Sequence, residues 1–114
     1  MQITEYRHGT VTVVELAGEL DSLTAPLSRD ELVRLASTGD PVLLDLTKTT
    51  YMSSAGLRVL LLVYRQATGS GTPVVLVGIT QPIHDVMAAT GFIDFFTITA
   101  TIDAGLDLLA GVQL

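Results

Sequence analysis

The chain has 114 residues, which is the size of one domain, and we expect a single domain over residues 1–114. Its 48% hydrophobic and 16% charged residues can supply a packed core and argue against disorder. A net charge of −6, with one lysine and five arginines, argues against partners such as nucleic acid or an acidic membrane surface.

The chain contains no cysteine, which excludes disulfides, thiolate metal sites and a cysteine nucleophile. Its first residues lack the basic segment and apolar stretch of a secretory signal, and no apolar run approaches the length of a membrane span. We therefore expect a soluble, cytoplasmic protein.

The N-terminal residues have the pattern of a β-hairpin. Residues 2–7 and 10–17 read as strands, because the second is rich in β-branched residues that nearly alternate with polar ones. His8 and Gly9 mark a tight turn between them. Gly18 ends the second strand.

A helix is predicted next, within residues 21–38. Ser22 or Thr24 can cap it, and Pro26 falls in the first turn, where a missing N–H costs little. Gly39 ends it.

The remaining elements alternate between strand and helix. Short apolar runs of the kind found in buried parallel strands occupy residues 42–46 and 73–79. Residues 47–54, "TKTTYMSS", read as a turn. Helices are predicted at 54–67, 80–90 and 101–111, with a weak strand at 95–98. The fold class is therefore α/β: a small sandwich in the order β-β-α-β-α-β-α-β-α, with a mixed, mostly parallel sheet of about five strands and about four helices.

The usual parts of an enzyme are missing from the sequence. His8 and His84 each lack a second histidine or acid at metal-ligand spacing. "GSGTP" at 69–73 has no lysine and no following helix, so it is not a phosphate-binding loop, and no serine lies in a G-x-S-x-G motif. We expect no enzyme activity, no metal and no cofactor.

Four polar residues fall at predicted strand ends and at the turn that follows. In parallel sheets, functional crevices lie beyond the carboxyl ends of the strands. Asp21, Asp45, Ser53 and Ser54 are therefore predicted to share one rim. The alternative is that both acids are turn residues, and from the pattern alone this is the simpler reading. Helix capping likewise explains both serines without any further function.

The segment "LLDLTKTTYMSSAGLRVLLLVYRQA" at 43–67 resembles the core signature of STAS domains, and more narrowly of bacterial anti-sigma factor antagonists. "LAGELDSLTAP" at 16–26 and "TPVVLVGITQPIHDVMAATGF" at 72–92 are similar to further stretches of the same family. The similarity covers nearly the whole chain and keeps the order of the elements. It implies a STAS-like sandwich.

Carried over by position, the resemblance gives individual residues roles. Met52 and Gly56 fix the alignment of this segment with the family's motif. Ser54 takes the place of the serine that is phosphorylated in the family, and Ser53 occupies the place of the usual aspartate. Asp21 and Asp45 fall on two acids that the family has near the switch. With the resemblance, Ser54 is the predicted switch and Ser53 the predicted helix cap.

The resemblance implies a regulator that switches between partners. Unphosphorylated, the protein would bind an anti-sigma factor that is also a serine protein kinase, and so release a sigma factor; phosphorylation at Ser54 would switch it off. A second possibility is a STAS adaptor without a phosphorylation switch, in a lipid-transport ATPase or a stress-signalling assembly. A small enzyme or nucleotide binder that uses Asp21 and Asp45 is the third. A weak homodimer also stays open.

Arg58, Leu62 and Arg65 form a stripe on the predicted second helix, away from its core side. A leucine between arginines suits an acidic partner. The same stripe is equally typical of a solvated helix face, on which the alkyl stems cover the core.

Overall fold

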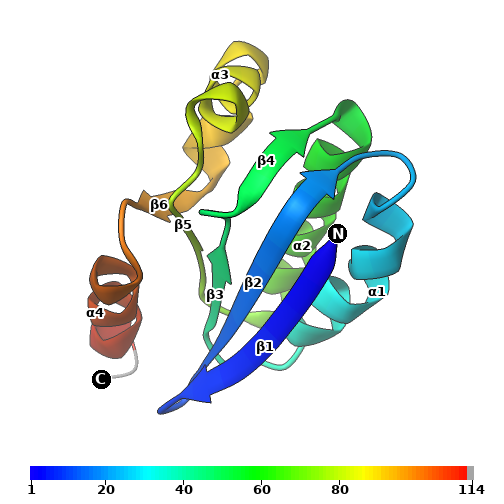
Figure 1. Ribbon diagram of the computed structural model, residues 1–114. Coiled ribbons are helices and arrows are strands. Elements are labelled where there is room, and N and C mark those ends of the chain that lie inside the picture. The colour runs from blue at the N-terminus through cyan, green and yellow to red at the C-terminus, as the bar shows by residue number, and fades with distance from the viewer. Residues whose placement is uncertain (113–114) are drawn as a thin grey trace.

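The computed structural model describes residues 1–112, and Figure 1 shows a twisted sheet with helices on both faces. The sheet has six strands, in the order β1-β2-β3-β5-β6, and β4 pairs with the far end of β2. The strands are β1 (Gln2–His8), β2 (Val11–Leu20), β3 (Val42–Asp45), β4 (Thr49–Met52), β5 (Val74–Val77) and β6 (Thr97–Thr99). Only β1 is antiparallel to its neighbour, so the predicted mixed sheet is confirmed.

The helices are α1 (Ala25–Leu35), α2 (Ser54–Ser70), α3 (Gln81–Thr90) and α4 (Ile102–Val112), with a short 3-10 helix η1 (Phe92–Phe95). The larger part of the core lies between the sheet and α1, α2 and α3. A smaller cluster lies on the opposite face, where α4 covers β3 and β5. The predicted α/β sandwich is therefore confirmed. Among the residues that the structure describes, none of the helices has the length and apolar character needed to cross a membrane.

One strand, β4, is not predicted from the sequence. Residues 49–52 were predicted as part of a turn, but they form β4, which runs parallel to the end of β2. The Thr49 hydroxyl donates a 2.7 Å hydrogen bond to the Leu16 carbonyl and is buried. Gly18 does not end β2 as predicted. Its φ of 110° lets the strand shift register there and continue to Leu20.

The predicted cap of α1 is only partly confirmed. The N-cap residues of α1 and α3 are Thr24 and Thr80, and neither side chain makes a capping hydrogen bond. Helices α2 and α3 end at Gly71 and Gly91, both in the left-handed conformation that glycine adopts without strain.

Candidate functional site

The paired ends of β2 and β4 position the start of α2. The Ser53 N–H donates a 3.0 Å hydrogen bond to the Leu20 carbonyl, which continues the pairing of the two strands by one residue. Ser53 is the N-cap of α2, and its side-chain oxygen accepts a 3.4 Å hydrogen bond from the Gly56 N–H. The predicted cap is thus confirmed, and the first turn of α2 is tied directly to the end of β2.

Gly56 lets the helix come this close. A Cβ atom placed on Gly56 would lie 2.9 Å from Cγ of Leu20 and 3.0 Å from Cγ of Met52, and closer still to the Leu20 backbone oxygen. Real Cβ atoms do not make such contacts, so only glycine fits between the first turn of α2 and the sheet. Gly56 and Met52, which are both buried, therefore hold the helix start in place.

Ser54 is the first residue of α2, and it is exposed. Its hydroxyl makes no hydrogen bond to any residue that the structure describes. The N-terminal turn of a helix carries unpaired N–H groups and a partial positive charge, which together favour an anion. Ser54 thus presents a free hydroxyl, at a helix start whose position is fixed by the sheet.

Asp21 organises the neighbouring turn between β2 and α1. Its carboxylate accepts hydrogen bonds from the N–H groups of Leu23 at 2.9 Å and Thr24 at 3.1 Å. These two bonds, that of Thr24 first, hold the pKa of Asp21 below its ordinary value. The Thr24 hydroxyl accepts from the Asp21 N–H and donates to the Glu19 carbonyl. Asp21 is thus an ionised turn residue beside the start of α2.

The prediction that Asp45 shares this rim is wrong. Asp45 lies opposite Glu15 on β2, whereas the rim begins at Leu20, five residues farther along that strand. At 3.3 Å per residue, this is about 16 Å away. Asp45 is buried and accepts hydrogen bonds from the backbone and hydroxyl of Thr47, at 3.0 and 2.7 Å. It shapes the turn from β3 to β4.

A surface groove runs between α1 and α2, and we call it the α1–α2 groove. The residues that line it include Ala25, Pro26, Arg29, Ala55, Arg58 and Leu62. A second hollow, farther along α2, is lined by Arg58, Leu61, Leu62 and Arg65. The three residues predicted to bind a partner, Arg58, Leu62 and Arg65, therefore lie together on the outside of α2, and two of them border both hollows.

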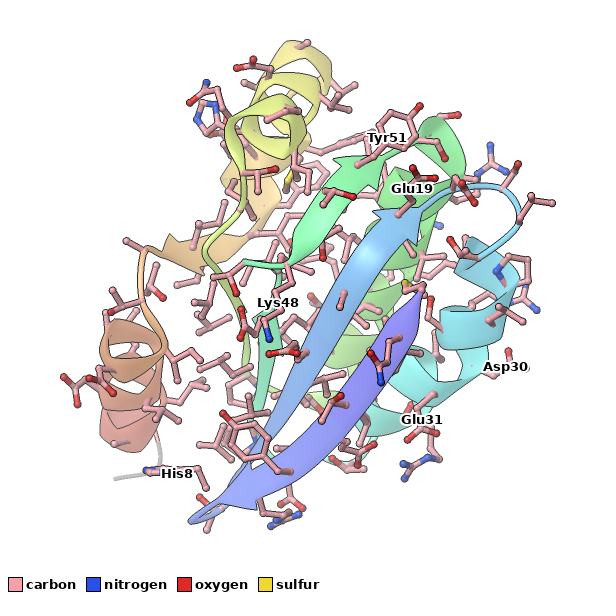
Figure 2. All side chains as sticks on the ribbon, viewed as in Figure 1. His8, Glu19, Asp30, Glu31, Lys48 and Tyr51 are labelled. Atoms are coloured by element: carbon pink, nitrogen blue, oxygen red, sulfur yellow. The ribbon has the colours of Figure 1, made fainter. Side chains whose placement is uncertain are left out.

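Three exposed apolar residues of this region were not singled out from the sequence. Leu23 is 82% exposed in the β2–α1 turn, Leu27 is 70% exposed in the first turn of α1, and Tyr51 is 50% exposed on β4. Figure 2 shows Tyr51 beside Glu19, its register partner on β2, at this end of the sheet. The one available signal was a leucine two residues after the acid of a turn, where a polar residue is usual.

The described residues offer no obvious metal site. None of their histidine, aspartate and glutamate side chains form a group of three or more that could hold an ion. His8 ends β1, and His84 lies on the exposed side of α3, 3.7 Å from Asp85.

The family sequence model of the STAS domain matches residues 2–105 of the chain. The chain belongs to the STAS domain family. An anti-sigma-B factor antagonist of Bacillus subtilis is 30% identical to this STAS domain over 93 residues, which cover 82% of this chain and 85% of that protein. An anti-sigma F factor antagonist of Paenibacillus polymyxa is 28% identical over 101 residues, or 86% of each chain.

Solved structures show the same fold. This STAS domain is similar to the crystal structure of an anti-sigma factor antagonist from Mycobacterium paratuberculosis, with a TM-score of 0.86 and 24% identity over 96% of this chain and 93% of that chain. It is also similar to the anti-sigma factor antagonist SpoIIAA in its unphosphorylated form, with a TM-score of 0.75 and 17% identity over 96% and 99% of the two chains.

Proposed function

We propose that this protein is a cytoplasmic anti-sigma factor antagonist controlled by phosphorylation of Ser54. In the unphosphorylated state it binds an anti-sigma factor that is also a serine kinase, and the sigma factor is released. The protein acts as ligand and as substrate, while the kinase supplies ATP. The exposed hydroxyl of Ser54, on a helix start held against the sheet, is the observation that carries the proposal.

The reaction at Ser54 is a phosphoryl transfer. The hydroxyl oxygen attacks the γ-phosphate of ATP, its proton passes to a base of the kinase, and ADP leaves. This requires a hydroxyl that an enzyme can reach, and Ser54 meets that requirement. The relatives from Bacillus subtilis and Paenibacillus polymyxa, both called anti-sigma factor antagonists, support the regulatory role.

The phosphate should leave the fold intact. It adds a charge of about −1.5 to −2 and three hydrogen-bond acceptors, and the N-terminus of α2 favours such a charge. The Bacillus protein SpoIIAA has been solved in unphosphorylated and phosphorylated forms, and both share this fold, with TM-scores of 0.75 and 0.73. Phosphorylation should therefore act on binding rather than on stability.

Binding of the partner should suffer for electrostatic reasons. Glu19 near the end of β2 and Asp21 in the turn after it already place two carboxylates near Ser54, on a chain of net charge −6. A partner that covers this end of the sheet would have to remove water from a phosphate dianion beside them, and each 1.4 kcal/mol lowers the affinity about tenfold. The partner-facing surface we propose comprises the α1–α2 groove with Arg58, Leu62 and Arg65.

Ser53 is compatible with this role although the family has an aspartate there. Serine and aspartate are equally good N-caps, and the Ser53 oxygen accepts the hydrogen bond that a carboxylate would. The exchange keeps the cap and removes one negative charge beside Ser54. It alters what a kinase meets next to its target, while the position of the target is retained.

The proposal is tested by phosphate transfer to matched variants. Wild type, Ser54→Ala and Ser53→Ala are each incubated with ATP and the anti-sigma factor kinase of the same organism, and their intact masses are measured. Wild type and Ser53→Ala should each gain one phosphate, and Ser54→Ala none. Equal phosphate uptake by Ser54→Ala and wild type would remove Ser54 from the mechanism. No uptake by wild type would favour a STAS adaptor that lacks the switch.

A further inference from the structure

Arg58 stands four residues after Ser54 on the same helix. Residues at i and i+4 of an α-helix lie on one face, with their Cβ atoms about 5–6 Å apart. Both side chains are exposed, so neither is held in place by the core. An acid placed N-terminal to a base at this spacing is the more favourable of the two orders. Arg58 is therefore within reach of any group attached to the Ser54 oxygen.

Arg58 is also free of other charges. Arg34 pairs with Glu31 and Lys48 lies 3.3 Å from Glu15, whereas Arg58 makes no ion pair with any residue that the structure describes. In the unmodified protein its guanidinium remains available at the point where the α1–α2 groove and the hollow beyond it meet. A free arginine at such a point suits the binding of an acidic partner.

We infer that a phosphate on Ser54 is bound in cis by Arg58, so that modification also withdraws this arginine from the α1–α2 groove. The inference rests on the proposed function for the presence of the phosphate. A guanidinium can donate two parallel hydrogen bonds to phosphate oxygens, which makes arginine a better partner for a phosphate than lysine. The switch then has two effects: it adds a dianion at the rim, and it occupies the cation that a partner would use.

Other charges near the phosphate are the carboxylates of Glu19 on β2 and Asp21 in the β2–α1 turn, and the guanidinium of Arg29 across the groove. All of them are unchanged when only Arg58 is replaced. A comparison between wild type and an Arg58 variant therefore isolates this one pair. Arg65→Gln is the matched control, because it removes the same charge from the same helix, about 16 Å along its axis from Ser54.

The test uses protein in which phosphoserine is installed at position 54 during translation, without any kinase. Titration of the phosphate by ³¹P NMR should show a lower second pKa in wild type than in Arg58→Gln. An exposed i,i+4 pair predicts a difference of about 0.2–0.4 pH units, or about a 1.5- to 2.5-fold change in the proton dissociation constant. The difference should shrink in 1 M salt, where the screening length is about 3 Å. Arg65→Gln should titrate like wild type.

Identical titrations of wild type and Arg58→Gln would overturn the inference. So would an equal effect of Arg65→Gln, because it would show a general field rather than a pair. Either result leaves the kinase test at Ser54 untouched. A failure of that kinase test would refute the proposed function without changing the titration, so the two ideas are refuted separately.

Discussion

Replacing Gly56 with alanine should destabilise the protein, although an alanine in a helix normally stabilises it. In a helix interior the exchange gains about 0.5–1 kcal/mol. Here the new methyl group would press on the backbone oxygen of Leu20, with Cγ of Leu20 at 2.9 Å and Cγ of Met52 at 3.0 Å. Overpacking of this kind costs about 1–3 kcal/mol. Displacing the Leu20 carbonyl also weakens its hydrogen bond from the Ser53 N–H, which is worth about 1 kcal/mol.

The sum is a net loss of about 1–3 kcal/mol in the free energy of unfolding. Urea denaturation followed by circular dichroism at 25 °C measures it. Gly69→Ala is the matched control, since it lies in the same helix and its added Cβ would meet nothing within 4 Å. That variant should be stabilised by up to about 1 kcal/mol. If Gly56→Ala proved as stable as wild type, α2 would not be held against β2 in the way described.

Three further variants test neighbouring contacts. Ser53→Ala removes the N-cap of α2 and should cost about 1 kcal/mol of unfolding free energy in urea, whereas no loss would show that the 3.4 Å bond to Gly56 contributes nothing. Thr49→Val removes the buried hydroxyl bond to the Leu16 carbonyl and should cost about 1 kcal/mol, and an unchanged midpoint would contradict its role in holding β4. Asp21 has a lowered pKa in the folded state, so the stability that it contributes is complete above its ordinary pKa and is lost as the pH falls through the lowered value. Asp21→Asn should therefore flatten the acid side of a plot of stability against pH, and parallel curves for the two proteins would contradict this.

Most of the fold follows from local patterns in the sequence. The alternation in residues 10–17, the apolar runs at 42–46 and 73–79 and the helical stripes each carry their own signal, and the structure confirms the α/β sandwich. Strand β4 carries no such signal. Thr49 and Met52 are buried while the two residues between them are exposed, and the pairing depends on a register shift at Gly18 of a strand about thirty residues earlier. Contacts of that kind are tertiary, and a single sequence does not display them.

The candidate site was predicted only in part, because some of its features are local in the sequence and others depend on tertiary contacts. The cap at Ser53 is a local device, and its prediction is confirmed. Asp45 was placed too close to the rim because the prediction let β2 and β3 end together, whereas β2 continues five residues past the partner of Asp45, to Leu20 beside β4. The sequence does not reveal that Leu23 is exposed, because its exposure depends on the conformation of the turn, in which the Leu23 N–H donates a hydrogen bond to Asp21. The resemblance to a family supplied the role of Ser54, which composition and spacing alone did not.

The most direct test is the affinity of the partner anti-sigma factor for the two states of Ser54. Isothermal titration calorimetry would compare the unmodified protein with protein carrying phosphoserine at position 54, after circular dichroism has shown that both are equally folded. A phosphate that must lose its water at the interface should weaken binding about a hundredfold or more, which corresponds to about 2.8 kcal/mol. Equal affinities for the two forms would contradict the proposal that the charge on Ser54 decides whether the partner binds.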